Sequence, residues 1–219
     1  GPDTLADATA HAATTAVNQA GVDGFIIYSV AANDPYLRAA CARGLPVVVC
    51  DQPTDSGAPF VGIDDDAAIR PAARAVLEAG HRRIGVLSIR LFQQRVDGAV
   101  AAADLPGADM HVQRGRVSGV LDECRRAGLD PAQIPVITRH INDAANARSA
   151  AREILDTHPE LTAIICTTDS MALAVLDEAR ERGISVPEQL SVTGFDGIAE
   201  ARHAGLTTII QPNKAKGAA

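Results

Sequence analysis

Polar residues stand directly after most of the strand-like apolar runs of this sequence, and their types and spacing suit ligand chemistry. In open parallel sheets, ligands bind beyond the carboxyl ends of the strands, where backbone groups and helix N-termini converge. Four of these residues are aspartates, and carboxylates accept paired hydrogen bonds from neighbouring hydroxyl groups. The pattern therefore predicts a site for a polyhydroxylated ligand, formed from Ser29, Asp51, Asp64, Ser88, His140, Thr168, Asp169, Phe195 and Asp196.

An aspartate after a strand has a second interpretation, because it is also a common N-cap of the helix that follows. For Asp65, Asp66 and Asp169 the capping role is favoured. For Asp196, which directly follows Gly194 and Phe195, ligand contact is favoured because of its place beyond a strand end.

Motifs for catalysis and for metal binding are absent from the sequence. There is no G-x-S-x-G elbow, no Walker loop and no H-E-x-x-H, and the segment 194–197 is too short for a dinucleotide fingerprint. The histidines have no metal-ligand spacing, and His81 is expected beside helix-terminal carbonyl groups. The cysteines form no C-x-x-C pair, which favours a reduced, cytoplasmic setting. We expect no catalytic residue, no cofactor and no metal.

The composition argues against nucleic-acid binding by this chain itself. It has 20 Lys and Arg against 27 Asp and Glu, a net charge of −7, and no basic face. The two basic groupings, 81–83 and the pair Lys214 and Lys216, are expected to be solvated surface. No signal peptide is visible at the N-terminus, and no apolar run approaches the ~18 residues of a membrane span.

Strand-like and helix-like stretches alternate along the chain, and each strand run is fully apolar. This pattern predicts an α/β fold of parallel sheets with helices on both faces. Residues 90–115 fit the rhythm least and are expected to be irregular. Strands are predicted over 25–28, 46–50, 60–63, 84–87, 134–138, 162–166 and 190–194, and helices over 35–43, 66–79, 116–127, 143–157 and 170–182.

Several motifs in the right order resemble the LacI/GalR family of repressors. The segment 191–197, Ser-Val-Thr-Gly-Phe-Asp-Gly, is similar to a family strand and turn, and 79–84, Ala-Gly-His-Arg-Arg-Ile, to a helix-to-strand junction. Residues 22–25, 45–49 and 168–172 also match, within a resemblance that runs from about 22 to 212.

The resemblance implies two doubly wound, periplasmic-binding-protein-like lobes that close on a small effector, a homodimer, and a DNA-binding helix-turn-helix head absent from this chain. The first lobe is expected to comprise 1–88 and 206–219 and the second 89–205. The first lobe is expected to be incomplete, because the family core opens with a further strand, helix and strand and closes with a further helix. The helix over 171–182 is a candidate for the dimer surface, or else plain core.

The resemblance also implies individual site residues. Asp196 matches a family position that hydrogen-bonds the effector. Arg116, in Arg-Val-Ser-Gly, matches the family's effector-binding arginine; Arg95, in Arg-Val-Asp-Gly, competes, and the amphipathic stripe after Arg116 favours Arg116. Thr168 stands where the family commonly has an amide, and Asp65 replaces a frequent asparagine. The expected effector-binding residues are Asp196, Arg116, Phe195, Thr168, Asp169, Asp64, Ser29 and Asn213.

The sequence thus predicts the effector-binding and dimerisation core of a DNA-binding transcriptional repressor. A sugar is the expected effector, with a nucleoside or purine next, and Tyr28, Phe92 and Phe195 are the candidates for ring stacking. The alternative is an extracellular sugar-binding transport receptor, which shares the two-lobed fold but seldom carries unpaired cysteines. An enzyme has the least support.

Overall fold

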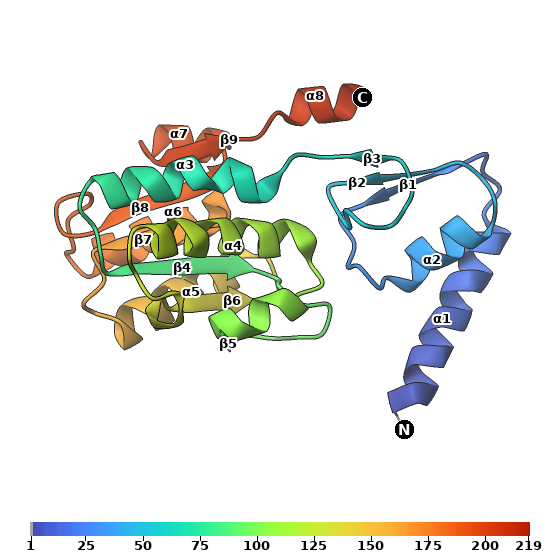
Figure 1. Cartoon of the computed structure of the whole chain (residues 1–219), viewed down its shortest axis with the longest axis horizontal. Helices are drawn as coiled ribbons and strands as arrows, with labels where there is room; N and C mark the ends of the chain where they lie inside the picture. The colour runs from blue at the N-terminus through green and yellow to red at the C-terminus, as the bar shows by residue number, and fades with distance from the viewer. Residues whose placement is uncertain (1) are drawn as a thin grey trace.

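A computed structural model describes residues 2–219, with side chains from residue 7 onward. The chain forms two units that lie side by side in Figure 1, each built on its own sheet. The larger unit has a six-stranded sheet and the smaller a three-stranded sheet. The predicted α/β class with parallel sheets is confirmed.

The larger unit is a sheet in the order β5-β6-β4-β7-β8-β9. All its neighbouring strands are parallel except β5 with β6, which are antiparallel. The central strands are buried on both faces, which explains their continuous apolar runs. The strands are β4 (Ile84–Ile89), β5 (Gly98–Ala99), β6 (Val136–Arg139), β7 (Ala163–Cys166), β8 (Ser191–Asp196) and β9 (Thr207–Ile210).

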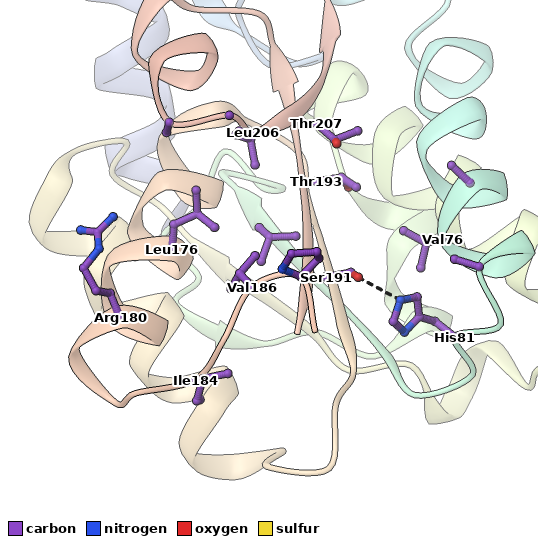
Figure 2. A pocket seen from close by; sticks show the side chains of 16 residues that line it. Val76, His81, Leu176, Arg180, Ile184, Val186, Ser191, Thr193, Leu206 and Thr207 are labelled. Carbon is purple, nitrogen blue, oxygen red and sulfur yellow. Dashed lines mark hydrogen bonds between the residues drawn. The ribbon is translucent and has the colours of Figure 1, made fainter. Parts of the chain in front are cut away.

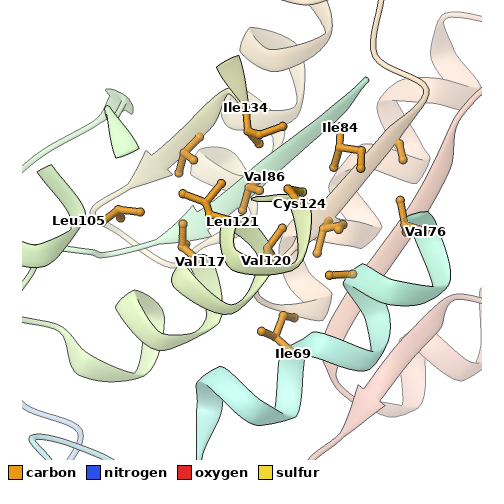
Figure 3. Close-up of a cluster of buried hydrophobic side chains, with 14 of the residues drawn as sticks. Ile69, Val76, Ile84, Val86, Leu105, Val117, Val120, Leu121, Cys124 and Ile134 are labelled. Atoms are coloured by element: carbon orange, nitrogen blue, oxygen red, sulfur yellow. The ribbon is translucent and has the colours of Figure 1, made fainter. Parts of the chain in front are cut away.

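Helices cover both faces of this sheet. On one face α3 (Asp65–Glu78) and α4 (His111–Arg126) pack over β4, as Figure 3 shows for Ile69, Val120 and Val86. On the other face α5 (Ala144–Thr157) and α6 (Asp169–Glu181) pack around Ile164. Two layers of buried aliphatic side chains therefore fix the positions of the strand ends.

The smaller unit has a parallel sheet of β1 (Phe25–Tyr28), β2 (Val47–Cys50) and β3 (Phe60–Val61). Helices α1 (Pro2–Gln19) and α2 (Pro35–Ala42) accompany it. Its cluster of buried apolar residues consists of Val17, Ala40 and Val47, whereas Ile26 is 77% exposed. This unit buries far less apolar surface than its neighbour.

The strand pairing corrects the predicted division into lobes. Residues 1–88 and 206–219 were assigned to the first lobe, but β4 pairs with β6 and β7 in the centre of the large sheet. Strand β9 likewise pairs with β8. The prediction failed because a strand run does not reveal which sheet it joins, and the chain crosses between the units at the start of α3.

Several element bounds also differ from the prediction. Helix α4 begins at His111, whereas the prediction placed its start at 116. The prediction missed the first turn because that turn is polar and shows no apolar stripe. The irregular stretch contains β5 and the 3-10 helix η1 (Ala102–Gly107). Four short elements have too few buried residues to give a hydrophobic pattern. They are the edge strand β9 and the helices η2 (Pro131–Gln133), α7 (Ala199–His203) and α8 (Asn213–Ala218). Across residues 2–219, none of the helices has the length and hydrophobicity needed to cross a membrane.

Candidate functional site

Arg116 on α4 is the centre of a buried polar cluster at the carboxyl ends of β7 and β8. It is 3% exposed. Its Nε donates to Asp65 Oδ1 over 2.7 Å, and its Nη1 donates to the carbonyl oxygen of Thr167 over 2.7 Å. The guanidinium lies 3.6 Å from the centre of the Phe195 ring, a cation–π contact. Arg116 therefore ties together the start of α3 and the ends of two strands.

Asp196 lies at the end of β8, beside Arg116. Its Oδ1 accepts a hydrogen bond from Gln211 Nε2 at 2.6 Å and lies 3.5 Å from Arg116 Nη1. Burial raises the pKa of Asp196, and Arg116 and Gln211 oppose that rise. Burial also raises the pKa of Asp65, and Arg116 opposes part of that rise. The side chain of Asp196 remains 26% exposed, so it is the accessible acceptor of the cluster.

A second polar pair extends the cluster to the smaller unit. Lys216 Nζ on α8 donates to Asp51 Oδ1 over 2.9 Å and to Gln211 Oε1 over 2.8 Å. Tyr28, which is 70% exposed, lies near Asp51, and partial burial together with the Asp51 charge raises the pKa of its phenol. The polar chain from Lys216 thus runs from Asp51, at the end of β2, to Asp196.

The expectation that Lys216 is solvated surface is wrong. Its side chain is only 15% exposed, because α8 brings it against Asp51. The pair joins residues 165 positions apart, so no local charge pattern signals it.

The structure brings Arg116, Phe195 and Asp196 together, as the sequence analysis expected. Phe195 is fully buried beneath the guanidinium, so its ring supports Arg116 and offers no face for stacking. Arg95 pairs with Asp97, and its side chain is 66% exposed. Of the two competing arginines, Arg116 is the one beside Asp196.

Asp169 and Thr168 have internal roles in the structure. Asp169 is fully buried, and its Oδ2 accepts the backbone N–H groups of Gly197 and Ile198 at 2.7 and 2.9 Å. Its other oxygen accepts the hydroxyl of Thr208. Thr168 is the N-cap of α6 and is 4% exposed. Asp169 therefore holds the turn after Asp196, and Thr168 holds the first turn of α6.

The remaining expected residues lie nearer the surface. Asp64 is exposed and caps α3 through Ala67 N–H at 2.9 Å. Asp64 and Thr168, which directly precede Asp65 and Asp169, thus perform the capping role that was predicted for these two aspartates. Ser29 is half-buried and accepts a hydrogen bond from Gln52, and Asn213 is exposed at the start of α8.

Gln52 and His111 connect the two units, and the sequence analysis missed both. Gln52 Oε1 accepts the backbone N–H of Val112 at 2.8 Å, in the first turn of α4, whose own N-cap residue gives no side-chain bond. The backbone N–H of Thr54 donates to His111 Nδ1 over 3.2 Å. The only sequence signal was the position of Gln52 directly after Asp51, a strand-end residue.

His81 lies away from this cluster, at the opposite end of β8. Its backbone N–H donates to the carbonyl oxygen of Val76 in the last turn of α3 over 3.3 Å, so it lies beside helix-terminal carbonyls as predicted. Its ring, however, bridges the hydroxyl groups of Thr162 and Ser191, both at 2.9 Å. Arg82 also donates to a carbonyl at this helix end, that of Leu77. His81 and Ser191 line a largely apolar cavity of about 540 Å³ between α3, α6 and the starts of β8 and β9 (Figure 2).

The chemistry of the polar cluster around Arg116 and Asp196 is that of binding. It offers a half-buried carboxylate, an arginine with a stacked guanidinium, a lysine and a phenol. Within the described part of the chain, no group of three or more His, Cys, Asp and Glu side chains is placed to hold a metal ion.

Comparison with known proteins adds independent findings. The model of the family described as periplasmic binding proteins and sugar binding domain of LacI family matches residues 3–215. The HTH-type transcriptional regulator IpsA of Corynebacterium glutamicum is 48% identical over 92% of this chain. The chain spans only 56% of that relative.

Solved structures give the same result. The crystal structure of a LacI-family transcriptional regulator from Corynebacterium glutamicum superimposes with a TM-score of 0.91 at 47% identity, covering 95% of this chain and 62% of that one. The structure of the transcriptional regulator CelR in complex with cellobiose superimposes with a TM-score of 0.78 at 27% identity, covering 95% of this chain and 60% of that one. These similar proteins are described as regulators rather than as transport receptors or enzymes.

Proposed function

The chain belongs to the LacI family, and from this premise we propose that it is the effector-binding core of a transcriptional repressor. The effector would bind in the cleft between the two units. The observation that carries the proposal is the polar chain from Asp51 and Lys216 to Asp196 and Arg116, which draws on both units.

The proposed mechanism is a shift between arrangements of the two units. A ligand changes such an equilibrium only by its differential affinity for the two states. An effector that bridges Asp196 and the Asp51 side favours the arrangement in which both contacts form. The equilibrium constant between DNA-competent and DNA-incompetent arrangements would change at most by the ratio of the effector's two affinities.

We propose a sugar as the effector, with a nucleoside as the second candidate. Asp196 suits vicinal hydroxyl groups, and we expect Nη2 of Arg116 to donate to a ligand oxygen. The cellobiose complex of the similar regulator CelR supports a sugar. The exposed ring of Tyr28 is available for stacking. Among the expected residues, Asp64, Ser29 and Asn213 would lie at the rim of the cleft, and Thr168 and Asp169 behind it.

The proposal extends to the whole protein. We propose that it binds operator DNA through a helix-turn-helix head, acts as a homodimer with α6 in the interface, works in the cytoplasm and performs no catalysis. The HTH-type name of the similar regulator IpsA supports the head. We further propose that the units are two lobes that divide where β3 leads into α3. A transport receptor, the alternative, lacks the support of these relatives.

Thermal unfolding in the presence of sugars, sugar alcohols, sugar phosphates and nucleosides tests the proposal. A ligand at about 100 times its Kd adds about 2.7 kcal/mol, which is roughly 5–10 °C for a chain of this size. The shift should disappear in Asp196→Ala. It should persist in Asp104→Ala, the same substitution at an exposed position on η1. A well-folded protein that responds to none of the compounds, or a response that survives in Asp196→Ala, contradicts the proposal.

A further inference from the structure

Both cations of the cleft are already neutralised by carboxylates. Arg116 contacts Asp65 at 2.7 Å and lies 3.5 Å from Asp196. Lys216 contacts Asp51 at 2.9 Å. Three carboxylates therefore face two cations, which gives 2 − 3 = −1 when all are ionised. An anion entering this cleft would meet a negative field rather than a positive one.

The donors of these cations are also largely occupied. Arg116 uses Nε and Nη1 within the protein, and its guanidinium face lies on the Phe195 ring. Lys216 directs two bonds to Asp51 and Gln211. Recognition of a phosphate by arginine depends on a pair of parallel N–H donors, and Nη1 is already committed. A single donor from each cation suits a hydroxyl oxygen.

The helix N-termini near this cluster are partly capped by oxygens of the protein, which weakens them as anion sites. Open N–H groups at a helix start bind phosphate readily. Here Asp64 takes Ala67 N–H of α3, and Gln52 takes Val112 N–H of α4. On α6, Thr168 is the N-cap. Each of these first turns already donates to an oxygen of the protein.

We propose that this cleft selects uncharged polyhydroxylated ligands over their phosphorylated forms, and that Asp51 sets the selectivity by neutralising Lys216. The inference rests on the proposed function, because it concerns the ligand of the same cleft. Asp196 and the single donors of Arg116 and Lys216 bind hydroxyl groups. A phosphate group gains no unpaired cation and approaches Asp51 and Asp196. The repulsion from these carboxylates therefore disfavours the phosphate ester relative to its neutral sugar.

The variant Asp51→Asn isolates this role. Asp51 has a φ of 66°, a left-handed backbone conformation that asparagine adopts readily, so the substitution preserves the turn. The substitution removes the carboxylate that pairs with Lys216 and changes the net charge of these five groups from −1 to 0. Asp34→Asn is the matched control, since it removes one negative charge from the smaller unit, retains a capping side chain at the start of α2, and leaves Lys216 paired.

The experiment measures the affinity of the protein for glucose, ribose and cellobiose and for glucose 6-phosphate, ribose 5-phosphate and inorganic phosphate by calorimetry. Wild type should bind a neutral sugar at least tenfold more tightly than its phosphate ester. Asp51→Asn should reduce that ratio by roughly tenfold or more, the effect of one charge-assisted hydrogen bond. Asp34→Asn should leave the ratio unchanged, and Lys216→Gln added to Asp51→Asn should abolish the gain in phosphate binding.

Three results would overturn the inference in distinguishable ways. Tighter binding of a phosphate ester than of its sugar by wild type contradicts the selectivity. Equal effects of Asp51→Asn and Asp34→Asn contradict the specific role of Asp51. Failure of wild type to bind any of the six compounds contradicts the proposed function itself, and the selectivity falls with it.

Discussion

The two units of this chain differ in how they hold their halves of the candidate site. In the larger unit, Arg116 and Phe195 are buried between α3, α4 and the sheet, and the surrounding side chains are fully buried aliphatics. In the smaller unit, Asp51 follows a strand of a three-stranded sheet, and Tyr28 and Ile26 on β1 are 70% and 77% exposed. One half is fixed by packing, and the other by hydrogen bonds across the units.

This difference indicates which half can move when a ligand binds. Apolar packing of a buried core is lost only on unfolding, whereas regions with few buried apolar contacts open at a lower free energy. The smaller unit is joined to the larger through Gln52, through Thr54 with His111, and through Lys216. Each of these bonds contributes about 0.5–1.5 kcal/mol. We therefore expect that a modest difference in a ligand's affinity for the two arrangements is sufficient to shift the equilibrium between them.

The largest expected effect is on the free energy of unfolding, and it contrasts one isoleucine in each unit. Ile165 on β7 is fully buried, so Ile165→Ala should lower the free energy of unfolding by about 2–5 kcal/mol, through lost apolar burial and the cavity it leaves. Ile26→Ala should change it by less than about 0.5 kcal/mol, because that side chain is 77% exposed. Urea unfolding measures both. A large loss in Ile26→Ala would show that β1 is covered in solution, and the contrast between the units would fail.

A smaller effect is expected from glycines in two helices. Gly119 lies where α4 packs on α3, and a Cβ there would lie 2.6 Å from the carbonyl oxygen of Asp66. Gly119→Ala should therefore destabilise the protein by about 1–3 kcal/mol. Gly217 on α8 has no heavy atom within 4 Å of such a Cβ. Gly217→Ala should stabilise by up to about 1 kcal/mol through helix propensity. Thermal unfolding measures both, and equal signs would contradict the difference in packing.

The sequence predicted the parts of this structure that local physics determines. Buried parallel strands give continuous apolar runs, so the α/β class and most elements followed from the pattern. The cluster of Arg116 and Asp196 followed from strand ends and from the family resemblance. What could not be predicted depends on distant pairing. The sheet that β4 joins and the hydrogen bonds of Lys216 and Gln52 depend on residues that lie far apart in the sequence. These residues share no local pattern.

Asp169 shows a further limit of prediction. As a carboxylate beyond a strand end it was expected to contact the ligand, yet it is fully buried and accepts the N–H groups of Gly197 and Ile198. Asp196 occupies an equivalent place in the pattern and remains partly exposed. The side chain's direction separates the two roles, and that direction depends on the turn that Asp169 itself holds.

The smallest expected effect is a pH response confined to the smaller unit. Burial lowers the pKa of His111 below 6.5, Arg114 lowers it further, and Asp55 and Asp109 oppose the change. The folded state thus favours the neutral ring, whose Nδ1 accepts the N–H of Thr54. This contribution is fully present above pH 6.5 and is lost as the pH falls through the lowered pKa of the folded state.

Lowering the pH from about 7.5 to about 5.5 should therefore increase hydrogen exchange at Val49 on β2 by roughly three- to tenfold after correction for intrinsic rates, the worth of one hydrogen bond. Exchange at Ile165 on β7 should not change. His111→Gln, which does not titrate, should remove the pH response, and Gln52→Ala should raise exchange on β2 equally at both pH values. Both variants remove a contact to the first turn of α4. Only His111→Gln removes a titrating group, so only this variant should abolish the pH response. A response that persists in His111→Gln, or that extends to β7, would mean that the units open together and that the smaller one is not held by these bonds.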